Sequence, residues 1–325
     1  MHTAPMRESD TRIWDHRLRV QRTRDIRAED PLRQPHREPA LTRIRQGVYA
    51  PTAEAESAMF GVRYLARVEA VAMTRDNPIL ARESALALHG IPYGNEPDRV
   101  FTTGSLRTAG LKSGVQHSRV LLDDVDVVEV HGVRVAALPA ALADLARHRG
   151  QRVAVAAIDA ALHEQRTTKD AVRDALARQS RTGRARAEAA IEFADARAES
   201  VGESWSRVLM HLLGFPAPEL QAKVCGASGR FWSPDFRWDL PELEKPLLGE
   251  FDGLEKYGRI ALANGKEPQE ALAEEKARED DLRVANNTAR WVWRDVMEPV
   301  RLESILVAHG LPHVRHPSIW LPKPA

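Results

Sequence analysis

The sequence predicts an α+β region followed by an α/β domain. Segments with apolar residues spaced near 3.6 alternate with short Val-rich segments in the first 180 residues. Beyond about residue 185 the expected order is helix, three strands, helix and strand, which is typical of an α/β unit. The length of 325 residues is enough for about two domains.

The first structured segment, LTRIRQGVYAP at 41–51, predicts a strand, a turn at Gln46-Gly47 and a second strand. Residues 54–93 have helical spacing, and ILARESALALHGI predicts a helix that ends at Gly90.

Residues 98–137 are Val-rich and separated by turns, so they predict strands in DRVFTT, SRVLL, DVVEVHGV and VRVAAL. The segment 139–150 opens with a Pro and stops at a Gly, as a helix does. Two more amphipathic helices precede a linker near 179–184.

A long helix is expected from the linker to about Leu213, with a kink at Gly202. On an ideal helix Glu203 falls opposite the apolar face. The remaining expected elements are strands at 220–225, 230–238 and 245–252, a charged helix at 267–286, a strand at 289–295 and a closing helix from 299.

The densest chemical signal is a set of three carboxylates on adjacent predicted strands. Asp235 lies on one strand, while Glu250 and Asp252 lie two residues apart on the next and share one face. Like charges this close repel unless a cation lies among them, and oxygen ligands suit Mg²⁺ or Mn²⁺. Such a metal stabilises charge on a phosphate. The alternative is a buried ionic cluster or a surface acid pair without activity.

This spacing of Pro-Asp and Glu-x-Asp resembles the PD-(D/E)XK nuclease superfamily, and more closely the very-short-patch-repair-like endonuclease domains. The EKARED run and the Arg290–Asp295 stretch resemble the downstream helix and strand of those domains. The resemblance covers about 185–306 and implies a restriction-endonuclease-like fold with a central mixed sheet. It implies that Asp235, Glu250 and Asp252 hold the metal.

The usual lysine of the motif is replaced by Asp252. Lys256, just past the strand, is the candidate substitute, and Lys276 or Arg278 could reach back from the following helix. Family members often carry a helical Glu before the first strand, and Glu203 is the candidate here. Trp232 and Trp238 are each three residues from Asp235, so we expect both on the opposite strand face, against a covering helix.

The N-terminal half resembles the winged-helix domain of AbiE-type abortive-infection antitoxins, through 41–51, LARESALALHGIP and HGVRVAALPAALADLARH. The resemblance covers about 40–165. Residues 11–35 lack a convincing pattern for the helix-turn-helix, so the winged helix is degenerate. Arg43 and Arg45 on the wing are candidates for nucleic-acid phosphate contacts, or are simply solvated.

Composition limits the class of protein. A net charge of +1 confines any nucleic-acid affinity to local patches, and one cysteine excludes a disulfide framework. No apolar run is long enough for a membrane span, and the N-terminus lacks a signal-peptide core, so we expect a cytoplasmic protein.

The predicted organisation is a basic, partly disordered or helical arm at 1–40, an antitoxin-like α+β region at 41–180 and a nuclease-like domain at 185–315. The predicted function is metal-dependent phosphodiester hydrolysis, DNA endonuclease-like, coupled to a DNA- or partner-binding N-terminal region. The alternative is a non-catalytic transcriptional regulator or antitoxin, with a toxin-like protein partner, that uses the nuclease-like domain as a scaffold. A third interpretation is action on RNA.

Overall fold

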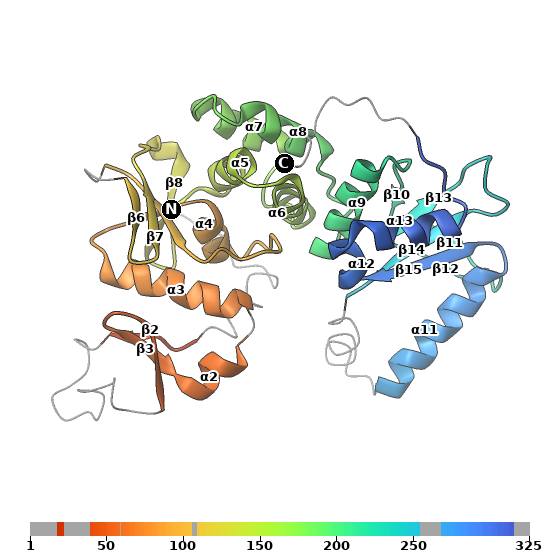
Figure 1. Ribbon diagram of the computed structural model, residues 1–325, viewed down its shortest axis with the longest axis horizontal. Coiled ribbons are helices and arrows are strands. Elements are labelled where there is room, and N and C mark those ends of the chain that lie inside the picture. The colour runs from red at the N-terminus through yellow and green to blue at the C-terminus, as the bar shows by residue number, and fades with distance from the viewer. Residues whose placement is uncertain (1–17, 23–39, 59, 106–108, 254–267, 315–325) are drawn as a thin grey trace. The chain divides into compact units, whose positions relative to one another are not determined.

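The computed structural model describes residues 18–22, 40–58, 60–105, 109–253 and 268–314. The chain divides into two compact units (Figure 1). Unit 1 comprises Met1–Ala157 and Glu164–Glu192, and unit 2 comprises Ile158–His163 and Phe193–Ala325. Helices and several small sheets occur together, so this is a mixed α+β protein.

The first part of the chain contains many short elements. In order they are β1 (Gln21–Arg22), β2 (Leu41–Arg45), β3 (Val48–Pro51), α2 (Thr52–Ser57), α3 (Phe60–Thr74), β4 (Ile79–Leu80), α4 (Arg82–His89), β5 (Val100–Thr103), β6 (Gly110–Lys112), β7 (Val115–Ser118), the 3-10 turn η4 (Asp124–Asp126), β8 (Val127–Val130), β9 (Val133–Ala136), α5 (Leu138–His148), α6 (Gln151–His163), α7 (Lys169–Arg178) and α8 (Arg184–Phe193).

The predicted hairpin at 41–51 is confirmed. Strands β2 and β3 pair antiparallel, and Gly47 makes the turn with φ of 78°, a left-handed conformation that favours glycine. Strand β1 pairs with the other side of β3, so the sheet order is β1-β3-β2. Most of the arm predicted at 1–40, and most of the 11–35 stretch, lies outside the described residues.

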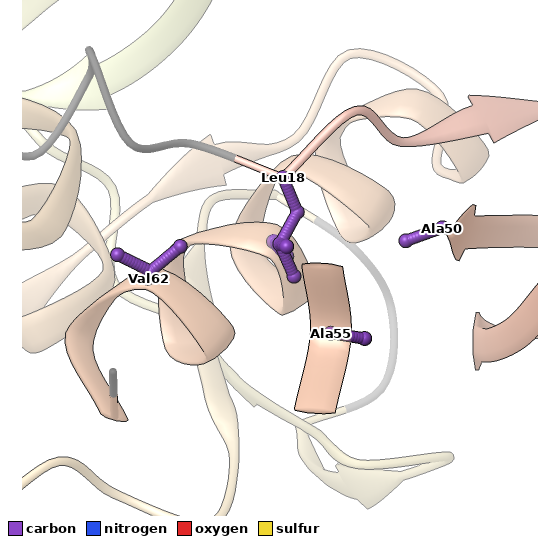
Figure 2. Close-up of a cluster of buried hydrophobic side chains, with 5 residues drawn as sticks. Leu18, Ala50, Ala55 and Val62 are labelled. Carbon is purple, nitrogen blue, oxygen red and sulfur yellow. The ribbon is translucent and has the colours of Figure 1, made fainter. Parts of the chain in front are cut away.

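A small apolar core fixes the hairpin to the two helices that follow it. Figure 2 shows Leu18, Ala50, Ala55 and Val62 gathered between the N-terminal segment, β3, α2 and α3. Leu18 is only 4% exposed. Burial of this apolar surface stabilises the position of the hairpin on α3.

Unit 1 also contains a larger, six-stranded mixed sheet, in the order β6-β7-β5-β4-β9-β8. Helix α4 ends as predicted at Gly90, which has φ of 73° and caps the helix in the left-handed conformation. The buried Ser84 hydroxyl lies 2.8 Å from the Tyr64 hydroxyl and accepts the Phe101 N–H at 2.8 Å. These bonds join α3, α4 and β5. The strand expected in SRVLL is wrong, because β7 ends at its first residue, Ser118.

Unit 2 is built around a second mixed sheet with the order β10-β13-β14-β15. Its first three strands are antiparallel, and β15 is parallel to β14. The elements are α9 (Val201–Leu213), β10 (Glu219–Leu220), β11 (Val224–Cys225), β12 (Phe231–Trp232), β13 (Phe236–Trp238), β14 (Leu247–Asp252), α11 (Pro268–Arg283), β15 (Asn287–Val292), α12 (Trp293–Met297) and α13 (Pro299–Ala308).

Helix α9 lies on the apolar face of this sheet. The Trp291 indole donates a hydrogen bond of 2.8 Å to the Ser206 hydroxyl. A Cβ on Gly202 would lie 1.9 Å from the Phe251 ring, so only glycine permits this approach of helix to strand. Phe236, Trp238 and Trp291 stack on the same face.

The long helix expected up to Leu213 is interrupted. Helix α8 ends at Phe193 and α9 begins at Val201, because the Ser200 hydroxyl accepts the Glu203 N–H and starts a new helix. The strands expected at 220–225 and 230–238 are also each divided. Gln221 has φ of 52°, and the ladder does not continue across Ser233-Pro234.

The outer pieces of those two divided strands, β11 and β12, form a two-stranded sheet of their own within the described residues. The strand expected at 289–295 ends at Val292, where α12 begins. Among the described residues, no helix is both long enough and apolar enough to cross a membrane.

Gly249 provides a test of the packing on the apolar sheet face. A Cβ there would lie 2.6 Å from Trp291 and 3.0 Å from Trp238, both buried. We expect Gly249→Ala to lower the free energy of unfolding by about 1–3 kcal/mol through overpacking, as measured by urea denaturation. Gly253→Ala is the matched control, because a Cβ at Gly253 would lie at an ordinary distance of 3.5 Å from the Phe251 ring. We expect little change in the free energy of unfolding for this variant. Equal stability of both variants would contradict this packing.

Candidate active site

Two of the predicted carboxylates are buried side by side at one end of the sheet. Phe236 pairs with Gly249, so Asp235 lies next to Glu250 across the β13–β14 ladder. Asp235 is 6% exposed and Glu250 is 5% exposed. Asp252 lies two residues further along β14, on the same face as Glu250, and is half-buried. The structure therefore brings Asp235, Glu250 and Asp252 to one face.

Backbone hydrogen bonding fixes Asp235. Its Oδ2 accepts the Phe251 N–H at 2.8 Å, and its carbonyl accepts the Gln221 N–H at 3.3 Å. The carboxylate is thus held by the strand that carries Glu250. A charge-assisted bond of this kind stabilises an ionised acid in a buried position.

Helix α11 covers this face of the sheet, opposite α9. Leu282 packs with Val224 and Leu248, and Trp232 lies against them. Arg278 is one turn before Leu282 and therefore shares its side of the helix. The Arg278 guanidinium donates to Glu250 Oε1 and, at 3.4 Å, to the Ser233 carbonyl.

A second arginine meets the third acid. Arg290 on β15 is paired with Glu250 in the parallel ladder, and its Nη1 lies 3.5 Å from Asp252 Oδ2. Each of the two acids on β14 therefore has a guanidinium partner. In the described part of the chain, no set of three or more His, Cys, Asp or Glu side chains is arranged to hold a metal ion.

Glu203 is buried, as are the residues on every side of α9 from Gly202 to Met210. It lies in the first turn, where its Oε1 accepts from the Ser200 hydroxyl at 2.7 Å and its Oε2 from the Glu199 N–H at 3.0 Å. Together with the Ser200 cap, these bonds fix the start of the helix, and Glu203 accepts the N–H of Glu199 in place of the Ser200 N–H that a capping box would use. Gln221 Nε2 also donates to Glu203 Oε2 at 3.3 Å, which links the helix to the strand end next to Asp235.

The basic side chains that could replace the missing lysine differ in where the structure places them. Lys256 lies outside the described residues. Lys276 is exposed, and Arg278 is the residue that contacts Glu250. Arg278 was only one of several candidates in the sequence. Its i, i+4 spacing from Leu282 indicates its position only when it is known that Leu282 faces the sheet.

Trp238 lies on the face opposite the acids, as expected, and its indole donates to the Pro216 carbonyl at 2.9 Å. The expectation for Trp232 is wrong, because it belongs to the separate β11–β12 hairpin and packs on the α11 side. Its indole donates to Asp281 on α11 at 2.7 Å. Ser228 adds bonds to Asp281 from its N–H at 2.7 Å and its hydroxyl at 2.9 Å, so Asp281 anchors the hairpin.

The predicted nucleic-acid contacts lie in unit 1. Arg43 and Arg45 are on β2, where Arg43 is exposed. Arg45 is half-buried and donates to the Thr74 hydroxyl at 3.0 Å and to the Ser113 carbonyl at 2.8 Å. Arg45 therefore joins β2 to α3 and to the β6–β7 turn through exposed hydrogen bonds.

Comparison with known proteins yields two partial relatives. The uncharacterized proteins MT2308 and Rv2248 of Mycobacterium tuberculosis, from strains CDC 1551 / Oshkosh and ATCC 25618 / H37Rv, are each 38% identical to this chain over 124 residues. The match covers 38% of the chain and 44% of each relative, so the chain spans less than half of their length. No family model and no solved structure matches the chain. The similarity is distant and partial, and neither printed name assigns an activity.

The Arg278–Glu250 pair can be tested by a double-mutant cycle. Arg278→Gln leaves a buried carboxylate without its cation, so we expect a loss of about 2 kcal/mol, reduced from the fully buried case because Arg278 is 21% exposed. Glu250→Gln in the Arg278→Gln background is expected to recover part of this loss. Urea denaturation of the four proteins gives the coupling, and a coupling near zero would show that the pair does not form.

The Asp281 anchor predicts acid sensitivity. Hydrogen bonds from the Trp232 indole and the Ser228 N–H hold the pKa of Asp281 below its usual value of 3.8. A lowered native pKa stabilises the fold above the unfolded pKa, and this stabilisation is lost as the pH falls through the native pKa. We therefore expect Asp281→Asn to be less stable than wild type at neutral pH, with the difference shrinking in acid.

Asp280→Asn is the control for the Asp281 prediction, since Asp280 is the exposed neighbour on the same helix. Urea denaturation at pH values from neutral to about 3 measures both variants. A stability difference for Asp281→Asn that is constant across this range would refute the anchor.

Proposed function

We propose that unit 2 hydrolyses phosphodiester bonds in DNA with the help of a divalent cation. The observation that carries the proposal is the burial of Asp235 and Glu250 side by side on one sheet face, with Asp252 at the next position on that face. Burying two carboxylates side by side costs free energy unless each has a partner, and a divalent cation between them would be such a partner.

The order of elements supports the same proposal. Helix α9 is followed by the antiparallel strands β10, β13 and β14, then by α11 and the parallel strand β15. This is the order of the PD-(D/E)XK and very-short-patch-repair-like endonuclease domains that the motif resembles. Fold alone does not imply function, so the acids carry the argument and the topology only agrees with it.

The donor set fits Mg²⁺ or Mn²⁺ in kind. The three acids are not arranged to hold a metal ion while Arg278 bonds to Glu250. Once Arg278 leaves Glu250, Asp235 and Glu250 would hold the cation and Asp252 would support it, since all three offer carboxylate oxygens. A bound divalent cation supplies positive charge to the phosphate and lowers the pKa of water. In the reaction a water oxygen forms a bond to phosphorus, one ester P–O bond breaks, and the departing oxygen takes up a proton.

Arg278 has a defined part in this proposal. Its guanidinium already lies at the site, on Glu250, and its planar donors match the oxygens of a phosphate. With the cation bound, Arg278 would turn from Glu250 to the phosphate and take the charge-stabilising role of the missing lysine. Lys256 remains a second candidate for that role.

The alternative function is a non-catalytic regulator or antitoxin whose unit 2 is a binding scaffold. One observation favours it: Arg278 and Arg290 already pair with Glu250 and Asp252. Such pairs compensate buried acids without any metal. In either case we propose that unit 1 supplies contacts to DNA or to a protein partner.

The test combines calorimetric titration of Mg²⁺ and Mn²⁺ with plasmid nicking on the same preparations of the full chain. We expect Asp235→Asn and Glu250→Gln to lose cation binding and to lower nicking at least about a hundredfold, because even changing a group that supports a metal ligand costs about 10–100-fold. A labelled RNA substrate assayed in parallel distinguishes DNA from RNA cleavage.

Asp239→Asn is the matched control for the nuclease test. Asp239 is an exposed carboxylate just past β13 that pairs with Arg237 at 2.6 Å, so the substitution removes an acid of the same type from the same sheet without touching the site. We expect this variant to bind cations and nick like wild type. Absence of both cation binding and cleavage in the wild-type protein, with DNA affinity retained in Glu250→Gln, would overturn the nuclease and favour the scaffold.

A further inference from the structure

Unit 1 contains a pocket of about 380 Å³ on the inner side of the hairpin. Three parts of the unit enclose it: strand β2 with its turn, helix α3, and the backbone around β5 and the β6–β7 turn. The lining residues are Arg43, Ile44, Arg45, Gln46, Arg67, Val71, Asp98, Val100, Ser113 and Gly114. Its volume falls within the range of small-molecule sites.

Two of its arginines are held by neutral oxygen atoms. Arg45 bonds to the Thr74 hydroxyl and the Ser113 carbonyl, and Arg67 bonds to the carbonyls of Asp98 and Pro97 at 3.2 and 3.1 Å. These bonds fix the direction of both guanidinium groups. The charge of Arg67 also interacts with the carboxylates of Glu96 and Asp98, whereas the two bonds of Arg45 go to neutral oxygen atoms. Fixed donors lose little freedom when a ligand binds.

The third arginine adds to this positive charge. No hydrogen bond or ion pair joins the Arg43 guanidinium to another residue that the structure describes. Asp98 is the only acid in the lining, and its Oδ1 accepts from Arg99 at 3.0 Å while the side chain is 81% exposed. The pocket lining therefore carries three guanidinium groups and one carboxylate, that of Asp98, which already accepts from Arg99. Glu96, outside the lining, is near Arg67, so the excess of positive charge lies mainly at Arg43 and Arg45.

A fourth arginine, Arg75, interacts electrostatically with Arg45. Burial lowers the pKa of Arg75, and the charge of Arg45 lowers it further, so the two guanidinium groups are near each other. Burial also lowers the pKa of Arg45. Neighbouring like charges are unfavourable, and an anion between or beside them removes that cost.

We propose that this pocket binds a phosphate group, carried either by a mononucleotide or by a nucleic-acid strand. A phosphate monoester carries nearly two negative charges and three acceptor oxygens, whereas a carboxylate carries one charge and two oxygens. Several converging guanidinium groups therefore favour phosphate, which arginine binds bidentately. Ile44, Val71 and Val100 supply apolar surface for the body attached to the phosphate.

This site is independent of the proposed nuclease, because every residue that lines it belongs to unit 1 and the acids belong to unit 2. It also extends the wing contacts expected of Arg43 and Arg45. Arg67 comes from helix α3, 22 residues beyond Arg45 in the sequence, and only the folded unit brings it to the hairpin.

The test uses the full chain and two phosphate-bearing probes. Adenosine 5′-monophosphate is titrated by calorimetry, with adenosine as the probe that lacks phosphate, and a fluorescent DNA duplex is titrated by anisotropy over a range of salt concentrations. We expect Arg43→Gln and Arg67→Gln each to weaken binding at least about tenfold, since each removes a charge-assisted hydrogen-bond donor. Arg43 is exposed, so its variant is expected to fold even if Arg67→Gln does not.

Arg63→Gln is the matched control, because Arg63 is exposed on the same helix one turn before Arg67 and does not line the pocket. Binding of the nucleotide but not of adenosine, lost in the two pocket variants only, assigns the site to a mononucleotide. If the two pocket variants bind the duplex more weakly than the wild type, and the salt dependence of their affinity falls by about one phosphate contact, the site is assigned to a nucleic-acid strand. The proposal would be overturned if the wild type and the three variants bound adenosine 5′-monophosphate equally and the DNA duplex equally. It would also be overturned if Arg63→Gln weakened binding as much as the pocket variants do.

Discussion

Strand β14 contributes to both faces of the sheet in unit 2, and the two faces place opposite demands on it. Gly249 and Phe251 face α9, where Trp238 and Trp291 leave no room for a larger residue at position 249. Glu250 alternates with them and therefore faces α11. Because the side-chain period of a strand is two, a slip of one residue would bury the acids among the tryptophans, so the apolar packing fixes the register that brings Glu250 beside Asp235.

Burying those acids has a large cost, and the fold offsets it with donors from several elements. The Phe251 N–H bonds Asp235, while Arg278 and Arg290 meet the two acids of β14. The arrangement suits two uses of the same site. In a scaffold the arginines would stay paired with the acids permanently. In a nuclease they would leave the acids when a cation binds and would pair with a phosphate instead. The second use accounts better for two acids buried side by side, since a purely structural site gains nothing from repulsion between them.

The candidate site of unit 1 is rich in arginines, whereas that of unit 2 is built from carboxylates. Its hairpin is fixed to α3 by apolar residues (Figure 2). Arg43 and Arg45 of the hairpin line one pocket together with Arg67 of α3. A phosphate-binding pocket in one unit and a phosphodiester-cleaving site in the other would act on related chemistry. The units are chemically complementary in that sense, although each proposal rests on its own residues.

The sequence by itself determined the features that depend on local rules. It predicted the turn at Gly47, the end of α4 at Gly90, and the common face of Glu250 and Asp252, because positive φ and a period of two follow from neighbouring residues. It did not predict the capping role of Glu203 or the separate β11–β12 hairpin that carries Trp232. Only the tertiary structure decided that Arg278 meets Glu250 and that Arg67 completes the pocket, because these contacts join residues far apart in the chain and depend on how helices α11 and α3 are packed.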